Sequence, residues 1–302
     1  MAVQLFTIFF NVVAPVFALV MVGYLLGSPL KLQYRTLSRS AYYLFVPAFT
    51  FHVLSNLRID LATAGRMLAG ISLVYLSTGF IGWCVARLMG LSREMAVAFL
   101  MIGIFGNSGN YGLALTLFRL GEGATQSATV YMVAINAMAF TVCVLAAGWL
   151  RKGGYGALKN LIKTPGITVL PVALCFPFTG TAPPVMIDRI TGLLGDAMIP
   201  TMLIGLGLQM REAGRLQWGV PALAASAVRL VAGPAVAFSV FPLLGLSGIA
   251  ASAGIIQSSM PAAVLTAIIA MENDIAPTFV TSVVFASTLL SQVSLTLVMG
   301  LL

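Results

Sequence analysis

The stretch GNSGNYG, residues 106–112, interrupts an apolar run that reads MAVAFLMIGIF before it and LALTLFRL after it. A second interruption, QSSMP at residues 257–261, separates the apolar segments ASAGII and AAVLTAIIA. Glycine, asparagine and serine are poor helix formers, and Pro261 lacks a backbone donor, so a helix should unwind or kink at both places. In hydrocarbon, such freed polar groups are tolerated only where protein or a water-filled cavity surrounds them.

Composition indicates that these interruptions lie in a membrane. The 302 residues are 60% hydrophobic and 8% charged, with a mean hydropathy of +1.03, whereas a soluble domain has about 25% charged residues. An apolar helix of roughly 20 residues spans the hydrocarbon core. We therefore predict an all-α integral membrane protein of about ten transmembrane helices. The predicted spans are residues 5–26, 38–56, 67–90, 95–119, 125–150, 164–181, 186–210, 220–244, 246–271 and 277–301.

Matching landmarks divide the chain into two halves. Residues recur at an offset of about 150 positions: Leu115 and Thr116 with Leu265 and Thr266, Glu122 with Glu272, Gly103 with Gly254, and Pro47 with Pro200. We predict two five-helix repeats, at residues 1–150 and 164–302, joined by a short basic loop at 151–163. An odd number of helices inverts the second repeat in the membrane. Inverted repeats are typical of secondary transporters, whose substrate site lies at interrupted helices near the midplane, here the fourth and ninth.

The two interruptions supply the predicted substrate site. Helix ends that meet at a break present unpaired N–H groups and positive dipole ends, which favour an anion. The predicted substrate-binding residues are Asn107, Ser108, Asn110, Tyr111, Gln257, Ser258, Ser259, Met260 and Pro261. The alternative is that these small and polar residues only allow helices to pack closely.

Three further residues are candidates for coupling or gating. Asp196 and Arg229 lie inside predicted spans, where a charge costs at least ~2.5 kcal/mol, so each needs a partner and the two could pair. His52 is the only histidine, and its titration range suits proton coupling; its alternative role is a packed residue near the membrane interface. The driving force stays open between H+, Na+ and the membrane potential. No cofactor and no resident metal are expected.

The motifs resemble those of a known family. GNSGNYGLALTL on the fourth helix, QSSMPAAVLTAI on the ninth and MIPTMLIGLGLQ on the seventh resemble the auxin efflux carrier family, which includes plant auxin carriers and bacterial malonate or malate carriers. The resemblance implies the fold of bile acid sodium symporters. In that fold, helices four and nine cross at the substrate, and the bundle that holds them moves like an elevator against a scaffold of helices one, two, six and seven. It also suggests a homodimer.

This chain departs from the family pattern at two places. Many members have a proline after the Gly-Leu of helix four, whereas this chain has Ala114. The break in helix four must therefore come from its glycines and asparagines alone. The central loop is also short, which favours the bacterial type of carrier over the plant type.

We accordingly predict a secondary transporter of a small organic anion, such as a mono- or dicarboxylate. One alternative is an anion channel. A second is a rhomboid-like intramembrane serine protease, because residues 106–109 match G-x-S-G and Ser108 would use His52 as its base. Nucleic acid is not an expected partner, because the basic residues are scattered and never form one continuous face.

The distribution of basic residues predicts orientation. Alternate connections hold eleven Lys and Arg residues on one side of the membrane and four on the other. Cytoplasmic loops carry the excess of positive charge. We therefore predict a multi-pass protein of the cell membrane, with both termini outside the cytoplasm and the 151–163 loop inside.

Overall fold

The computed structural model describes residues 2–151, 168–212 and 216–302. Within these ranges the chain is helical and contains no strand, apart from one isolated antiparallel bridge between Gly106 and Ala262. The predicted all-α class is confirmed for this part of the chain. Apart from Arg151, the predicted 151–163 loop falls outside the described residues.

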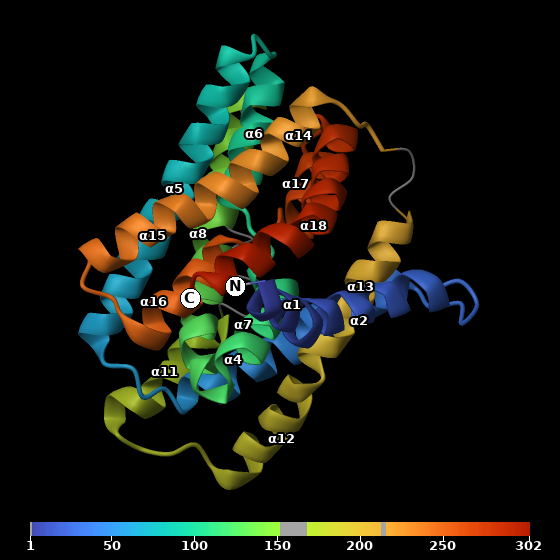
Figure 1. The fold of residues 1–302 in the computed structure, drawn as a ribbon. Helices are drawn as coiled ribbons and strands as arrows, with labels where there is room; N and C mark the ends of the chain where they lie inside the picture. Colours follow the sequence, from blue (N-terminus) through green and yellow to red (C-terminus); the bar gives the residue numbers. More distant parts are fainter. Residues whose placement is uncertain (1, 152–167, 213–215) are drawn as a thin grey trace.

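The first half of the chain forms long helices with short π-helical turns inside them (Figure 1). Its elements are α1 (Ala2–Ile8), η1 (Phe9–Val13), α2 (Ala14–Leu26), α3 (Tyr34–Ser40), η2 (Ala41–Phe45), α4 (Val46–Ser55), α5 (Leu61–Leu88), α6 (Arg93–Ile104), η3 (Ser108–Gly112), α7 (Leu113–Leu120), η4 (Glu122–Ala124) and α8 (Thr125–Arg151). Of these turns, η1, η2 and η3 are π-helical and η4 is a 3₁₀ turn.

The second half continues in the same way. Its elements are α11 (Leu170–Thr179), α12 (Val185–Asp196), α13 (Met198–Glu212), α14 (Val220–Ala227), the π-helical turn η5 (Val228–Ala232), α15 (Gly233–Leu243), α16 (Gly248–Ser258), α17 (Val264–Glu272) and α18 (Pro277–Gly300). Each of the ten predicted spans contains helix.

Five helical segments in the described ranges are long and apolar enough to cross a membrane by length and composition. They are Ala2–Leu26, Leu61–Leu88, Val185–Glu212, Val220–Leu243 and Pro277–Gly300. The predicted fourth and ninth spans are each divided into two shorter helices. The multi-pass class therefore stands, while the count of ten crossings and the inverted repeat stay predictions.

Capping residues fix where two helices of the first half begin. The Asp60 carboxylate accepts the Thr63 N–H at 2.8 Å at the start of α5, and the Ser92 hydroxyl accepts the Met95 N–H at 3.2 Å at the start of α6. The Thr63 N–H stabilises the charged form of the carboxyl group and so lowers the pKa of Asp60. These caps satisfy donors that have no partner within the helix.

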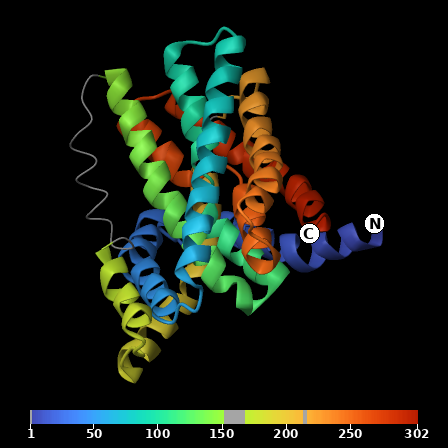
Figure 2. The same ribbon diagram turned by 90° about the vertical axis from the view of Figure 1, so that its left-hand side faces the viewer.

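The helices pack into two groups. In the first, α2 packs along α13 and α1 joins it through η1, while α4 packs along α11 and α12, with α3 against α13. We call α1–α4 and α11–α13 the scaffold group. In the second, α5 packs on α6, α8 and α15, while α18 packs on α14 and α17. We call α5–α8 and α14–α18 the crossing bundle. Figures 1 and 2 show α5, α6, α14 and α15 side by side, away from α11 and α12.

Two glycines bring the backbones of α2 and α13 into direct contact. A Cβ atom at Gly207 would overlap the carbonyl oxygen of Val20, and one at Gly23 would overlap that of Ile204. Small residues at such positions let membrane helices approach closely, which strengthens van der Waals packing between them. The contact joins the two longest elements of the scaffold group.

Replacing Gly207 should therefore separate α2 from α13. We expect Gly207→Ala to destabilise the protein by about 1–3 kcal/mol, because the added methyl group forces a backbone shift. The matched control is Gly205→Ala on the same helix, where a Cβ atom meets nothing within 4 Å. Thermal unfolding in detergent measures both. Equal unfolding temperatures for the two variants would contradict the close contact.

Candidate functional site

The two broken helices meet at an antiparallel backbone bridge. The Asn107 N–H donates to the Pro261 carbonyl at 2.8 Å, and the Ala263 N–H donates to the Phe105 carbonyl at 2.8 Å. Gly106 and Ala262 lie opposite each other between these two bonds. Each unwound segment therefore satisfies backbone groups that the other has freed, which a break at membrane depth requires.

Neighbouring side chains hold the rest of the bridge. The Ala262 N–H donates to the hydroxyl of Ser287 on α18 at 3.1 Å. Gly106 lies so close to Tyr75 that a Cβ atom would be 2.6 Å from its hydroxyl oxygen. Ala114 is buried at the second position of α7, after the break. The break in helix four thus forms among glycines and asparagines, without a proline at position 114.

Arg229 lies beside the bridge and is fully buried. It comes from η5, a π-helical turn of the kind often found at functional sites. Its Nε donates to the Met260 carbonyl at 2.8 Å, its Nη1 to the Gly103 carbonyl at 2.9 Å and its Nη2 to the Ser258 carbonyl at 3.1 Å. These carbonyls belong to the last turns of α6 and α16 and the segment that follows α16. Arg229 therefore binds the carboxyl ends of both broken helices.

Tyr75 on α5 holds the guanidinium in place. Its ring centroid lies 4.5 Å from the Cζ of Arg229, a cation–π geometry. Its hydroxyl accepts a hydrogen bond from Nη2 of Arg229 at 2.8 Å and donates one to the Gln257 carbonyl at 2.8 Å. The tyrosine thus links the arginine to a further carbonyl of α16.

A cavity of about 290 Å³ lies between the scaffold group and the crossing bundle. This volume is close to the lower end of small-molecule sites, at roughly 300 Å³. The scaffold side comprises α3, η2, α4 and α13, and the bundle side comprises residues 105–110, part of α8 and the start of α17. Its polar lining residues are Tyr34, Ser38, Tyr42, Thr50, Asn107, Ser108, Asn110, Asn136, Thr201 and Gln209. Among the described residues, none that lines it is charged.

Several polar atoms of this lining are buried without a partner. Across the described chain, no hydrogen bond reaches Asn107 Nδ2, Ser108 Oγ, Thr50 Oγ1 or Gln209 Oε1. Buried polar groups in proteins are almost always hydrogen-bonded, so such a cluster requires an explanation. A polar molecule in the cavity would supply the missing bonds.

Two helix starts also line the cavity. Residues 263–265, at the beginning of α17, and residues 107–110, at the beginning of η3, contribute to its wall. N–H groups in the first turn of a helix have no intrahelical acceptor. Each helix start carries about half a positive charge. The cavity therefore has a positive character although its lining side chains are neutral.

The structure separates the predicted substrate-binding residues into two sets. Asn107, Ser108 and Asn110 line the cavity. The other six are outside its lining: Tyr111, Gln257, Ser258, Ser259, Met260 and Pro261. The Tyr111 hydroxyl accepts a hydrogen bond from Gln292, and the backbone carbonyls of Ser258, Met260 and Pro261 bind Arg229 and Asn107. The five residues of helix nine lie outside the lining because they form the end of α16 and the segment after it, whereas the start of α17 faces the cavity.

Sequence reasoning missed some of the lining. Thr50, Asn136, Thr201 and Gln209 come from three predicted spans, with Thr201 and Gln209 in the same one. Each is a polar residue within a mostly apolar run, and an amide such as Asn136 at mid-span was a usable signal, because polar groups are costly in hydrocarbon. Tyr34 was missed because it precedes its predicted span.

The three coupling candidates lie outside the lining. His52 Nδ1 is 2.9 Å from the Asp188 carboxylate, which also accepts a hydrogen bond from Asn56 at 3.0 Å.

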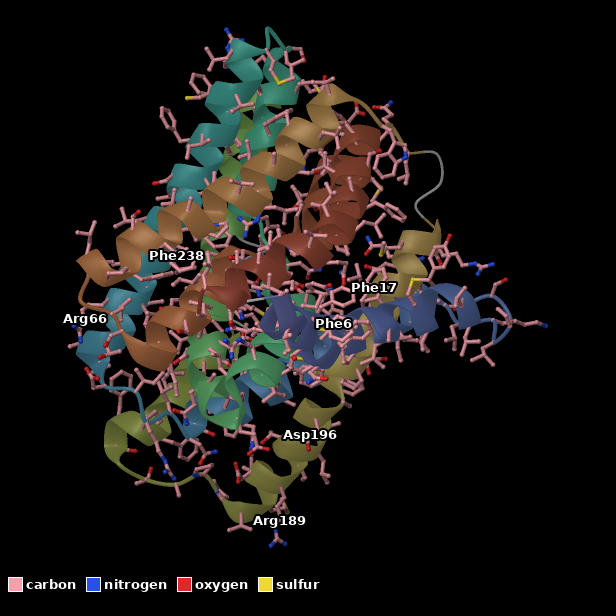
Figure 3. The ribbon with its side chains drawn as sticks, viewed as in Figure 1. Phe6, Phe17, Arg66, Arg189, Asp196 and Phe238 are labelled. Atoms are coloured by element: carbon pink, nitrogen blue, oxygen red, sulfur yellow. The ribbon has the colours of Figure 1, made fainter. Side chains whose placement is uncertain are left out.

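Asp196 is exposed where α12 ends, and Figure 3 shows it within the scaffold group. In the described chain Arg229 binds carbonyls and the Tyr75 hydroxyl instead of Asp196. The suggested Asp196–Arg229 pair was therefore wrong, because the two residues belong to different helix groups.

The structure does not form the suggested serine–histidine pair. The hydroxyl of Ser108 has no hydrogen-bond partner among the described residues, and His52 is paired with Asp188, so they form no catalytic dyad. In the same ranges no group of three or more His, Cys, Asp or Glu side chains is placed to hold a metal ion.

Within the described ranges, apolar helices of membrane length surround two broken helices that pair with each other beside a cavity with neutral polar side chains in its lining. These features are those of a membrane transporter. The profile of the family described as "Membrane transport protein" matches residues 8–171 and 157–299 of this chain. The chain therefore belongs to this family, the auxin efflux carrier family, as the motifs of helices four, seven and nine indicated.

Two archaeal proteins are similar over nearly their whole length. An uncharacterized transporter of Methanothermobacter thermautotrophicus is 28% identical over 293 residues, covering 94% of this chain and 95% of the relative. An uncharacterized transporter of Methanocaldococcus jannaschii is 24% identical over 294 residues, covering 93% of this chain and 94% of the relative.

The hydroxyl of Ser287 should stabilise the crossing. Ser287→Ala leaves the buried Ala262 N–H without its acceptor, so we expect a loss of about 1–3 kcal/mol in thermal unfolding. Ser226→Ala is the matched control, because Ser226 is equally buried but its hydroxyl donates only to the Ala222 carbonyl of its own helix. An equal loss in both variants would show that Ser287 does not hold the bridge.

Proposed function

We propose that this protein is a secondary transporter of a small organic anion, such as a mono- or dicarboxylate. The substrate would bind in the cavity against Asn107, Ser108 and Asn110 and the starts of η3 and α17. One observation carries the proposal: two helix starts and several unpaired polar atoms converge on a single cavity whose described lining has no charged side chain.

The electrostatics of the cavity favour an anion of low charge. Two helix starts together supply roughly one positive charge, which matches one carboxylate. The amides of Asn107, Asn110 and Asn136 and the hydroxyls of Ser108 and Thr50 can donate hydrogen bonds to its oxygens. An organic cation would find no carboxylate in the described lining. The second carboxylate of a dicarboxylate would depend on neutral donors alone.

The position of the cavity supports alternating access. Its wall is shared between the scaffold group and the crossing bundle, and the contacts between the groups include η3 on α13 and α8 on α4. A rigid movement of the bundle along the scaffold would carry the breaks and the anion together, which is the elevator mechanism that the family resemblance implied. Both breaks belong to the crossing bundle, so Asn107, Ser108 and Asn110 would move together, while the scaffold side of the cavity wall would change.

The channel alternative differs in its kinetics. A carrier binds and releases one substrate per cycle, so its flux saturates and is stimulated by substrate on the opposite side. An anion channel would give single-channel currents that do not saturate in the same way. Flux under imposed pH, sodium and voltage gradients would identify the driving force.

Orientation and assembly belong to the same proposal. The excess of basic residues in alternate connections supports a cell-membrane protein with both termini outside the cytoplasm. The family resemblance supports a homodimer. Labelling of single cysteines from each side of intact cells would test the orientation, and mass measurement in detergent would test the dimer.

The two asparagines of the break should be required for transport. In proteoliposomes we expect Asn107→Ala and Asn110→Ala each to raise the half-saturating substrate concentration roughly 10–100-fold, since a hydrogen bond to a charged group contributes about 1.5–3 kcal/mol. Asn273→Ala is the matched control, because its amide donates to the Ile269 carbonyl at the far end of α17. The substrate is first selected by thermal stabilisation with a panel of mono- and dicarboxylates. Unchanged flux in both cavity variants would exclude this site.

A further inference from the structure

Arg229 and the cavity contact opposite ends of the broken helices. Arg229 binds carbonyls at the carboxyl ends of α6 and α16, while the cavity is lined by the starts of η3 and α17. Arg229 is absent from the described lining. Arg229 is the one embedded cation that the sequence indicated in the crossing bundle. Its role is therefore separate from substrate contact.

Carbonyl groups at the end of an interrupted helix form a cation site. Helix carboxyl ends carry about half a negative charge each. In transporters with discontinuous helices, such ends and the unwound carbonyls coordinate the coupling Na+ or H+. Here two such ends converge, and the carbonyl oxygens of Gly103, Ser258 and Met260 all lie within 3.1 Å of one guanidinium. The site that would otherwise attract an exchangeable cation is already filled.

We propose that Arg229 is a built-in cation that replaces an exchangeable coupling ion, so that this carrier works without sodium. The inference rests on the proposed transport function and specifies its coupling. An arginine side chain cannot lose its charge in a protein, so this cation is present throughout the cycle. It neutralises roughly one negative charge from the two helix ends without an ion that binds and leaves.

The guanidinium is fully buried and closely packed. Tyr75 covers one face of it at 4.5 Å. Gly106 touches it so closely that a Cβ atom there would overlap Nη2. Arg229 also belongs to the crossing bundle, through η5, which packs on α5, α6 and α18. Any movement of the bundle would therefore carry the cation together with both breaks.

The wild-type protein provides the first test. A coupling ion typically changes the affinity for the transported substrate by a factor of roughly 5–150. Because we expect no coupled sodium ion, the initial flux in choline chloride should be within about twofold of that in NaCl. The unfolding temperature without substrate should also be equal in NaCl, KCl and choline chloride at one ionic strength. A fivefold or larger loss of flux without sodium, or sodium-specific stabilisation, would overturn the proposal.

Removing the arginine provides the second test. Arg229→Ala should lose transport and unfold at a lower temperature, and Na+, Li+ or dilute guanidinium should restore part of both in a saturable manner, because they can occupy the freed carbonyls. Arg229→Lys should keep its independence of added cations. Arg119→Ala is the matched control. Among the described residues, Arg119 donates only to the Met299 carbonyl, away from the breaks, and added cations should not rescue this variant.

The outcomes separate the two proposals. A loss in Arg229→Ala that no cation relieves would overturn the built-in cation and leave a purely structural arginine. If Arg229→Ala does not fold, the wild-type comparison of NaCl and choline chloride still decides. The unfolding measurement needs no substrate, so its result stands even if carboxylates prove not to be transported.

Discussion

Backbone hydrogen bonding at membrane depth is the constraint on which the rest of this structure depends. Each unpaired peptide group in hydrocarbon costs several kcal/mol, and two interrupted helices free many of them at once. The crossing satisfies several of these groups internally: the breaks pair with each other, Ser287 binds one N–H, and Arg229 binds three carbonyls. The helix starts are different, because they line a cavity. In the proposed function, the ligand binds where this internal pairing stops.

In the proposed anion site, this division would supply the positive potential without a charged side chain in the described lining. Arg229 faces the negative helix ends and leaves the positive ends of η3 and α17 for the cavity. A lining arginine would hold a carboxylate strongly and oppose its release. Dipoles and neutral amides attract an anion less strongly and are fixed by the backbone. Such moderate attraction suits a carrier, which must release its substrate on the other side of the membrane in every cycle.

The sequence located both breaks, because glycine, asparagine and proline have backbone effects that can be recognised without a structure. It also indicated that Arg229 needs a partner. It did not identify that partner, because backbone carbonyls have no signature in the sequence. For the same reason it missed the start of α17, where Ala263 and Val264 line the cavity and have no polar side chain. Asn136 and Gln209 were missed because only the packing of several helices brings them together.

Pro261 shows why the two breaks need not be alike. In the bridge, Asn107 and Ala263 donate, while Phe105 and Pro261 accept. Proline retains its carbonyl but has no N–H, so it occupies a position where only an acceptor is used. Asn107, the residue opposite, must donate and could not be proline. Helix four therefore has to unwind through flexible residues such as Gly106, which also allows the close approach of Tyr75 and Arg229. One break therefore contains a rigid proline, and the other consists of flexible residues.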